Sequence, residues 1–297
     1  LLRSAVLYGP NASGKSNLVA ALSCMRRLVV TSATKIQEGE KLNIVPFLLD
    51  NEVSNMPTIF EIIFIEDKIR YQYGFSATNT QIMEEWLYAF PKSKGQQWFT
   101  RKYNIESNQY EWHYSTHLKG ARHIWENATR SNALFLSTAV NLNSEQLRPI
   151  YNWFFNKLFL LKSNTRLSLN FTIDALAKDK AKVLQFLQAA DLGITNIEVK
   201  NRKVYRLALN NELGKDSLKP EEVLVPEIRF YHQCKNNGNP VSFDFNDESQ
   251  GTQRLFAYAG YALELLEQNR VLVVDELSSS LHPTLMRFLL SLIQNPE

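Results

Sequence analysis

The residues with the most definite chemistry form a glycine-rich run near the start of the chain. Residues 9–16, GPNASGKS, match the pattern G-x-x-x-x-G-K-[ST] at every fixed position. Glycines let such a loop fold tightly and turn successive backbone N–H groups toward phosphate oxygens. Lys15 would then reach the β- and γ-phosphates of a nucleotide, and the Ser16 hydroxyl would ligate Mg²⁺.

The segments on either side of this loop favour the same interpretation. The apolar residues 4–8 predict a strand before the loop. Leu18, Leu22 and Met25 follow at helical spacing, and the N-terminus of that helix would direct its positive dipole at a bound anion. A chance glycine turn before a helix is the alternative, and the strand–loop–helix order argues against it. The predicted nucleotide-binding residues are Gly9, Pro10, Asn11, Ala12, Ser13, Gly14, Lys15, Ser16 and Asn17.

A second group with catalytic chemistry lies near the other end of the chain. Residues 271–274, VLVV, are typical of a central strand buried on both faces, and two carboxylates follow directly. Asp275 would hold Mg²⁺ through a water molecule, and Glu276 would polarise the attacking water as general base. The alternative is an ordinary strand end with surface acids, and the complete phosphate loop favours the catalytic interpretation.

The remaining hydrophobic patterns predict a mixed α/β chain. The turn 66–68 joins two strand patterns into an antiparallel hairpin, to which two more strands would add. The predicted strands are 58–65, 69–75, 81–90, 97–103, 197–209, 227–231, 241–245 and 270–274. The predicted helices are the one starting at Lys15, 132–142, 144–158, 173–190, 253–267 and 283–294.

Composition sets broad limits on the class of protein. The 297 residues are 44% hydrophobic and 21% charged, which predicts a folded globular chain. Two cysteines, Cys24 and Cys234, are too few for a disulfide framework, so we expect a cytoplasmic protein. No apolar run in the sequence reaches the roughly 18 residues that a membrane-spanning helix needs, so we expect no such helix. The net charge of +3 neither requires nor excludes a nucleic-acid partner.

Six stretches spread over nearly the whole chain carry a family resemblance. They are AVLYGPNASGKSNL (5–18), FEIIFIEDKIRYQYGF (60–75), EEWLY (84–88), NALFLSTA (132–139), ESQGTQRLF (248–256) and VLVVDELSSSLHP (271–283). Together they resemble the ABC-type ATPase heads of the RecF, SMC and OLD group, and within it the RloA-type ATPases of restriction and abortive-infection loci.

The resemblance implies a fold and a division into domains. We expect an α/β, ABC-type P-loop ATPase head with a mixed sheet, an antiparallel β-subdomain and a helical insertion. Residues 1–104 would form the N-terminal lobe with the phosphate loop, 105–226 a mostly helical insertion or lid, and 227–297 the C-terminal lobe. A further strand before the loop and a switch histidine after the last helix are also expected, so the sequence would be part of a longer chain.

The resemblance also implies roles for residues that spacing alone does not explain. Ser249, Gly251 and Thr252 would form a signature turn that caps the γ-phosphate of a second protomer. This turn is ESQGT here, whereas ABC transporters have LSGGQ. The loop that would cross the dimer interface contains Ser279, Ser280 and His282. Two heads would thus sandwich ATP and Mg²⁺ as a homodimer or higher oligomer.

The implied function is an ATPase that dimerises on ATP and regulates or scaffolds a separate effector, a nuclease or toxin, in anti-phage defence. A RecF-like clamp that binds nucleic acid in DNA repair is the alternative.

Two further clusters allow more than one interpretation. His113 and His117, with His123 nearby, could bind zinc if they lay on a helix, or could belong to a solvated loop. Trp112, Trp125 and neighbouring basic residues could stack on and grip nucleic acid, or could form a packed surface.

Overall fold

A computed structural model describes residues 4–162, 167–190, 193–212, 215–234, 238–277 and 283–294. The chain divides into two compact units. We call the first the sheet unit, which comprises Tyr8–Leu160 and Arg270–Val273. The second is the hairpin unit, which comprises Leu1–Leu7, Leu161–Asn269 and Val274–Glu297.

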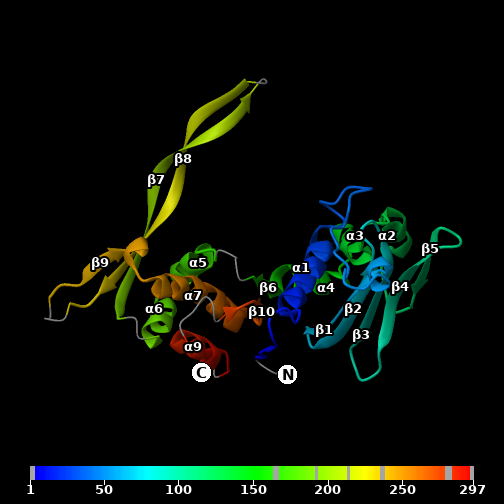
Figure 1. Cartoon of the computed structure of the whole chain (residues 1–297), viewed down its shortest axis with the longest axis horizontal. Helices are drawn as coiled ribbons and strands as arrows, with labels where there is room; N and C mark the ends of the chain where they lie inside the picture. Colours follow the sequence, from blue (N-terminus) through cyan, green and yellow to red (C-terminus); the bar gives the residue numbers. More distant parts are fainter. Residues whose placement is uncertain are drawn as a thin grey trace. The chain divides into compact units, whose positions relative to one another are not determined.

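A five-stranded antiparallel sheet forms the centre of the sheet unit, with its strands in sequence order (Figure 1). The strands are β1 (Thr58–Glu66), β2 (Ile69–Ala77), β3 (Ile82–Phe90), β4 (Gln96–Asn104) and β5 (Gln109–Tyr114). Asp67 and Lys68, with φ of 49° and 65°, make the tight β1–β2 turn whose twist suits a two-residue hairpin. The predicted hairpin and its two added strands are confirmed, whereas β5 was missed.

Helices cover one face of this sheet (Figure 1). They and the short helical turns are α1 (Lys15–Thr31), η1 (Val53–Asn55), α2 (Arg122–Ala128), α3 (Phe135–Asn141), α4 (Arg148–Asn152) and η2 (Trp153–Lys157). Leu28 of α1, Phe135 of α3 and Phe75 of β2 are fully buried in one shared core. The inward face of α1 differs from the expectation, because Leu18 is 50% exposed while Val19 is buried.

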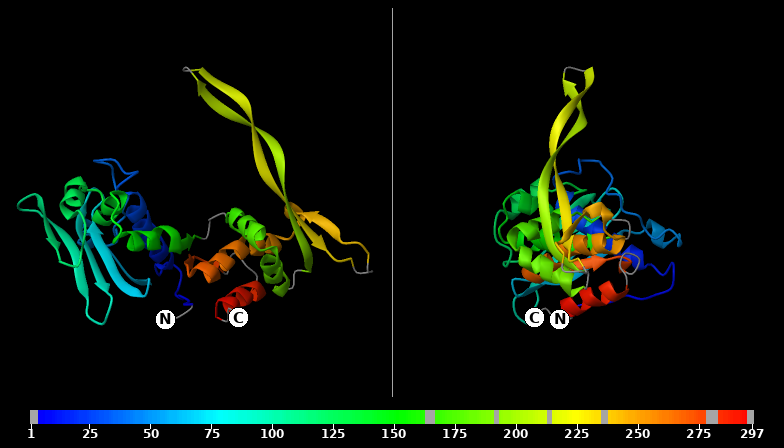
Figure 2. Two further views of the ribbon diagram at one scale, coloured as in Figure 1. Left: turned by 180° about the vertical axis from the view of Figure 1, so that it is seen from behind. Right: turned by 90° about the vertical axis from the view of Figure 1, so that its left-hand side faces the viewer.

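The hairpin unit combines helices with a long two-stranded ribbon that extends beyond them (Figure 2). The ribbon consists of β7 (Ile194–Glu212) and β8 (Lys215–His232), and β9 (Val241–Asp244) pairs with the end of β8. The other elements are α5 (Asn170–Lys178), α6 (Lys180–Ala189), η3 (Phe245–Asp247), α7 (Gln250–Gln268) and α9 (Pro283–Gln294). The predicted helix 173–190 is divided in two at Asp179, whose side chain accepts a hydrogen bond from Lys182 N and caps α6.

Three expectations about the architecture need correction. Residues 4–8 do not form a strand: among the described residues no strand pairs with them, and Leu7 and Tyr8 are 63% and 89% exposed. The expected mixed sheet is therefore not present in the described part of the chain, where β10 (Val271–Val274) pairs with β6 (Leu158–Leu161) alone. Residues 105–226, expected to be mostly helical, also contain β5, β6, β7 and much of β8.

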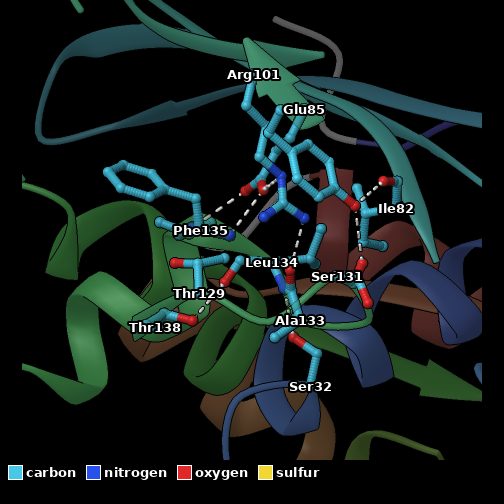
Figure 3. Close-up of polar contacts among 12 residues, drawn as sticks. Ser32, Ile82, Glu85, Arg101, Thr129, Ser131, Ala133, Leu134, Phe135 and Thr138 are labelled. Carbon is cyan, nitrogen blue, oxygen red and sulfur yellow. Dashed lines mark hydrogen bonds and ion pairs between the residues drawn. The ribbon is translucent and has the colours of Figure 1, made fainter. Parts of the chain in front are cut away.

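A buried ion pair joins the sheet to α3 (Figure 3). The side chains of Glu85 on β3 and Arg101 on β4 are both fully buried, with Arg101 Nε 3.4 Å from Glu85 Oε2. Glu85 also accepts hydrogen bonds from Phe135 N at 2.7 Å and Leu136 N at 3.0 Å, at the start of α3. Burial raises the pKa of the Glu85 carboxyl, while Arg101 and these N–H groups act in the opposite direction. Glu85 belongs to the EEWLY stretch and α3 to NALFLSTA, so these two stretches meet in a structural contact.

The same network reaches the end of α1. Arg101 Nη2 donates to Ala133 O at 2.6 Å, and the next residue, Leu134, donates its N–H to Ser32 Oγ at 3.1 Å (Figure 3). One turn further along α3, Ser137 Oγ donates to Val29 O at 2.5 Å. The sheet thus holds α3, and α3 holds the C-terminal end of the helix that begins at the glycine-rich loop.

Replacing Glu85 with alanine is expected to lower the free energy of unfolding by about 3–5 kcal/mol, because it leaves the buried Arg101 charge without its partner. Urea denaturation measures this. Lys182→Ala breaks the exposed Lys182–Glu267 pair and serves as control, with a far smaller loss expected. Equal losses in the two variants would contradict a structural role for the buried pair.

Candidate nucleotide-binding site

The glycine-rich loop runs directly into α1, which begins at Lys15. Gly14, the residue before the helix, has φ of 89°, a left-handed conformation that glycine adopts without the penalty of a Cβ. Ala12 is also left-handed, with φ of 62°. Alternation of left- and right-handed residues curves a backbone so that successive N–H groups form a concave anion-binding surface. The local conformation therefore suits a phosphate group at the N-terminus of α1.

Lys15 folds back over this loop. Its Nζ donates hydrogen bonds to Gly9 O at 2.8 Å and to Pro10 O at 2.7 Å, and lies 3.5 Å from Ser13 Oγ. The ammonium group is thus held at the loop by two neutral carbonyl oxygens. A phosphate would offer the same ammonium stronger, charge-assisted hydrogen bonds. These donors fit the phosphates of a nucleotide, and the hydroxyl of Ser16, in the first turn of α1, is an oxygen ligand of the kind Mg²⁺ prefers.

The candidate catalytic carboxylates follow β10. Asp275 N donates to Leu161 O at 2.8 Å, which continues the β10–β6 pairing one residue beyond the strand. Glu276 then adopts φ of 56°, an uncommon conformation for a residue with a side chain. Such conformations persist where the surroundings enforce them, often at functional sites.

The burial expected for β10 needs correction. The apolar run was predicted to be covered on both faces, but Val271 is 41% exposed and the other residues of the strand are half-buried. Among the described residues, β10 has β6 as its only strand partner, so much of its surface is left uncovered.

The predicted signature turn lies at the N-terminus of α7. Ser249 caps this helix: its Oγ accepts a hydrogen bond from Thr252 N at 3.1 Å and lies 2.9 Å from Thr252 Oγ1. Gly251 is in the first turn of α7, which begins at Gln250, three residues before the predicted start. The turn therefore presents the backbone of a helix start, as a phosphate-binding turn requires.

Sequence reasoning missed a residue beside this turn. His232 Nε2 lies 2.6 Å from Glu248 Oε1, and Glu248 directly precedes Ser249. Histidine and glutamate are sixteen positions apart with no shared motif, so no sequence signal would have paired them.

The candidate site residues are distributed over both units. Residues 9–16 of the loop, together with Asn17, lie in the sheet unit, whereas Ser249, Gly251, Thr252, Asp275 and Glu276 lie in the hairpin unit. Ser279, Ser280 and His282 of the expected interface loop lie outside the described residues. The assembly of these groups into one site remains a prediction.

The structure places most residues of the two ambiguous clusters on defined elements, and His113 lies neither on the helix nor in the loop that were the two alternatives. His113 lies on the strand β5, so its spacing to His117 is not helical. The described residues contain no group of three or more histidine, cysteine, aspartate or glutamate side chains placed to hold a metal ion. Trp112 and Trp125 pack around the buried Phe135, with ring centroids 5.3 Å and 6.3 Å away. These aromatic side chains therefore contribute to the core of the sheet unit.

A glycine-rich loop that delivers a lysine and a serine to the start of a helix defines the chain as a P-loop nucleotide-binding protein. Residues 4–297 match the family described as "AAA domain, putative AbiEii toxin, Type IV TA system", and the chain belongs to this family. The family is of toxin–antitoxin, abortive-infection type, and an AAA domain implies nucleotide binding and hydrolysis in general, typically with a divalent metal ion. The comparison with curated proteins found no match. Across the described ranges, no helix is long and apolar enough to cross a membrane.

Proposed function

We propose that the chain is an ABC-type ATPase head that dimerises on ATP and regulates or scaffolds a separate effector, a nuclease or toxin, in anti-phage defence. The observation that carries the proposal is the loop itself, where the left-handed Gly14 leads into α1 and Lys15 Nζ lies over the loop, an arrangement suited to an anion. Membership of an AAA family of abortive-infection type supports the link to defence.

Within this proposal each candidate residue has a defined task. Lys15 binds the β- and γ-phosphates, and Ser16 with Asp275 would hold Mg²⁺, which supplies positive charge to the phosphate oxygens. Glu276 orients a water molecule and accepts its proton as that water attacks the γ-phosphate. Transfer of this proton to Glu276 removes the positive charge that would otherwise build up on the oxygen of the attacking water.

The signature turn would act on the ATP bound to a second protomer. The N-terminus of α7 offers backbone N–H donors and the positive end of a helix dipole, both suited to a γ-phosphate. Ser279, Ser280 and His282 would cross the interface beside Glu276. ATP would then link two heads, and hydrolysis would remove the link. In this arrangement residues 1–104 and 227–297 form the two lobes of the head, and 105–226 the insertion.

The alternative clamp on nucleic acid has weaker support. The aromatic residues that could have stacked on bases, Trp112 and Trp125, pack against Phe135 instead. A repair clamp would bind DNA in an ATP-dependent manner with a steep dependence on salt, because phosphate contacts release counterions. Binding of this kind would favour the clamp over the effector regulator.

Replacing Ser249 with alanine is expected to abolish ATP-dependent dimerisation, while removal of the helix cap costs only about 1 kcal/mol of stability. Sedimentation velocity with ATP and Mg²⁺ measures the first effect, and urea denaturation the second. Asp179→Ala is the matched control, because Asp179 caps α6 of the same unit through Lys182 N. If the two variants dimerise equally well, Ser249 is only a helix cap.

A further inference from the structure

A histidine–glutamate contact connects the base of the long ribbon to the signature turn. His232 is the last residue of β8, and its Nε2 lies 2.6 Å from Oε1 of Glu248. The Glu248 side chain is only 9% exposed, and that of His232 is 26% exposed. The imidazole ring packs edge-on against Phe243 of β9, with centroids 5.4 Å apart and planes at 82°. The pair is thus fixed by the surrounding structure.

Aromatic packing also attaches β8 to α7. Phe230 of β8 is fully buried and packs edge-on against Phe256 of α7, with ring centroids 5.2 Å apart. Phe245 of η3 lies 6.2 Å from Phe230 and 5.9 Å from Phe256. These three aromatic rings therefore attach the ribbon to the helix alongside the His232–Glu248 contact.

The position of Glu248 suggests a role for its contact with His232. Its carboxylate belongs to the residue immediately before Ser249, beside the helix N-terminus that would receive a γ-phosphate. A negative charge at this place would repel the phosphate and would itself be attracted to the same positive helix end. The contact with His232 Nε2 holds the carboxylate in place.

We propose that His232 is a positioning residue that restrains the Glu248 carboxylate, so that the signature turn can accept the γ-phosphate of a second protomer. This inference rests on the proposed ATP-dependent dimerisation. It assigns to His232 an effect on association through Glu248, without contact between His232 and the nucleotide.

The test uses the full chain in a Glu276→Gln background, in which ATP is expected to be consumed only slowly. Sedimentation velocity with ATP and Mg²⁺ gives the dimer dissociation constant. His232→Phe keeps the ring against Phe243 but removes the nitrogen that restrains the Glu248 carboxylate, and dimerisation should weaken about tenfold or more. Glu248→Gln removes the charge, and dimerisation should be unchanged or tighter. The double variant His232→Phe/Glu248→Gln should return to within about twofold of Glu248→Gln.

If the His232–Glu248 contact only stabilises the fold, the variants should dimerise differently. In that case Glu248→Gln alone would weaken dimerisation, and the double variant would be no better than His232→Phe; either result overturns the inference. His123→Phe, which breaks the exposed His123–Glu126 pair, is the control and should leave the dissociation constant unchanged. If the parent Glu276→Gln protein does not dimerise on ATP, the proposed function fails and this inference fails with it. If the parent dimerises and His232→Phe dimerises equally well, only this inference is wrong.

Discussion

Replacing Glu276 with glutamine is expected to slow ATP hydrolysis by about 10²–10⁴-fold while ATP still binds. Glutamine has the shape of glutamate but cannot accept the proton of the attacking water. The backbone of Glu276, with φ of 56°, is set by its surroundings, so the amide should occupy the place of the carboxylate. The phosphate contacts of Lys15 lie on a different element, the start of α1, and should be unaffected. Phosphate release at saturating ATP and Mg²⁺ measures the rate.

Glu267→Gln provides the control for this substitution, because it changes an exposed carboxylate on α7 that pairs only with Lys182 in the described contacts. Its hydrolysis rate should equal that of the parent protein. A parental rate in Glu276→Gln would show that another group is the general base. Loss of ATP binding in Glu276→Gln would instead assign Glu276 to binding of the nucleotide.

Replacing Lys15 with alanine is expected to weaken ATP binding about 10- to 100-fold, the equivalent of about 1.5–3 kcal/mol for hydrogen bonds to a charged group. The loss arises because the phosphates would no longer meet the ammonium that Gly9 O and Pro10 O hold at the loop. Titration with a fluorescent ATP analogue measures the affinity. Hydrolysis should fall as well, since Lys15 also stabilises the charge on the γ-phosphate during transfer.

Lys35→Ala removes an exposed lysine after α1 and serves as the control for charge alone. It should bind ATP as the parent does. The thermal unfolding of Lys15→Ala should stay close to the parent value, because Lys15 contacts only its own exposed loop in the contacts described above. An unchanged affinity for ATP in Lys15→Ala would show that the loop is not the phosphate site.

Local patterns in the sequence predicted the local structure well. The β1–β2 hairpin was predictable because the short polar turn 66–68 separates two strand patterns. The helix after the loop was predictable from its glycine start, and α9 (Pro283–Gln294) has the predicted bounds because proline suits a first helical position. These features depend on residues that are neighbours in the sequence, so local sequence patterns predict them.

Features that depend on distant partners were not predictable. Residues 4–8 have the composition of a strand, but a strand also needs a neighbour for its backbone hydrogen bonds, and composition does not say whether one is present. The Glu85–Arg101 pair looks in the sequence like two solvated charges on exposed strands, and its complete burial follows from the packing of α3. The contact of His232 with Glu248 likewise depends on how β8 returns to α7.

The most direct test of the central claim is the molecular mass of Glu276→Gln with ATP and Mg²⁺, measured by light scattering on a sizing column. ATP-dependent dimerisation predicts twice the 34.3 kDa of the single chain with ATP, and the single-chain mass with ADP. The double variant Lys15→Ala/Glu276→Gln should keep the single-chain mass in both nucleotides. A single-chain mass for Glu276→Gln at saturating, bound ATP would contradict the proposal that ATP joins two heads.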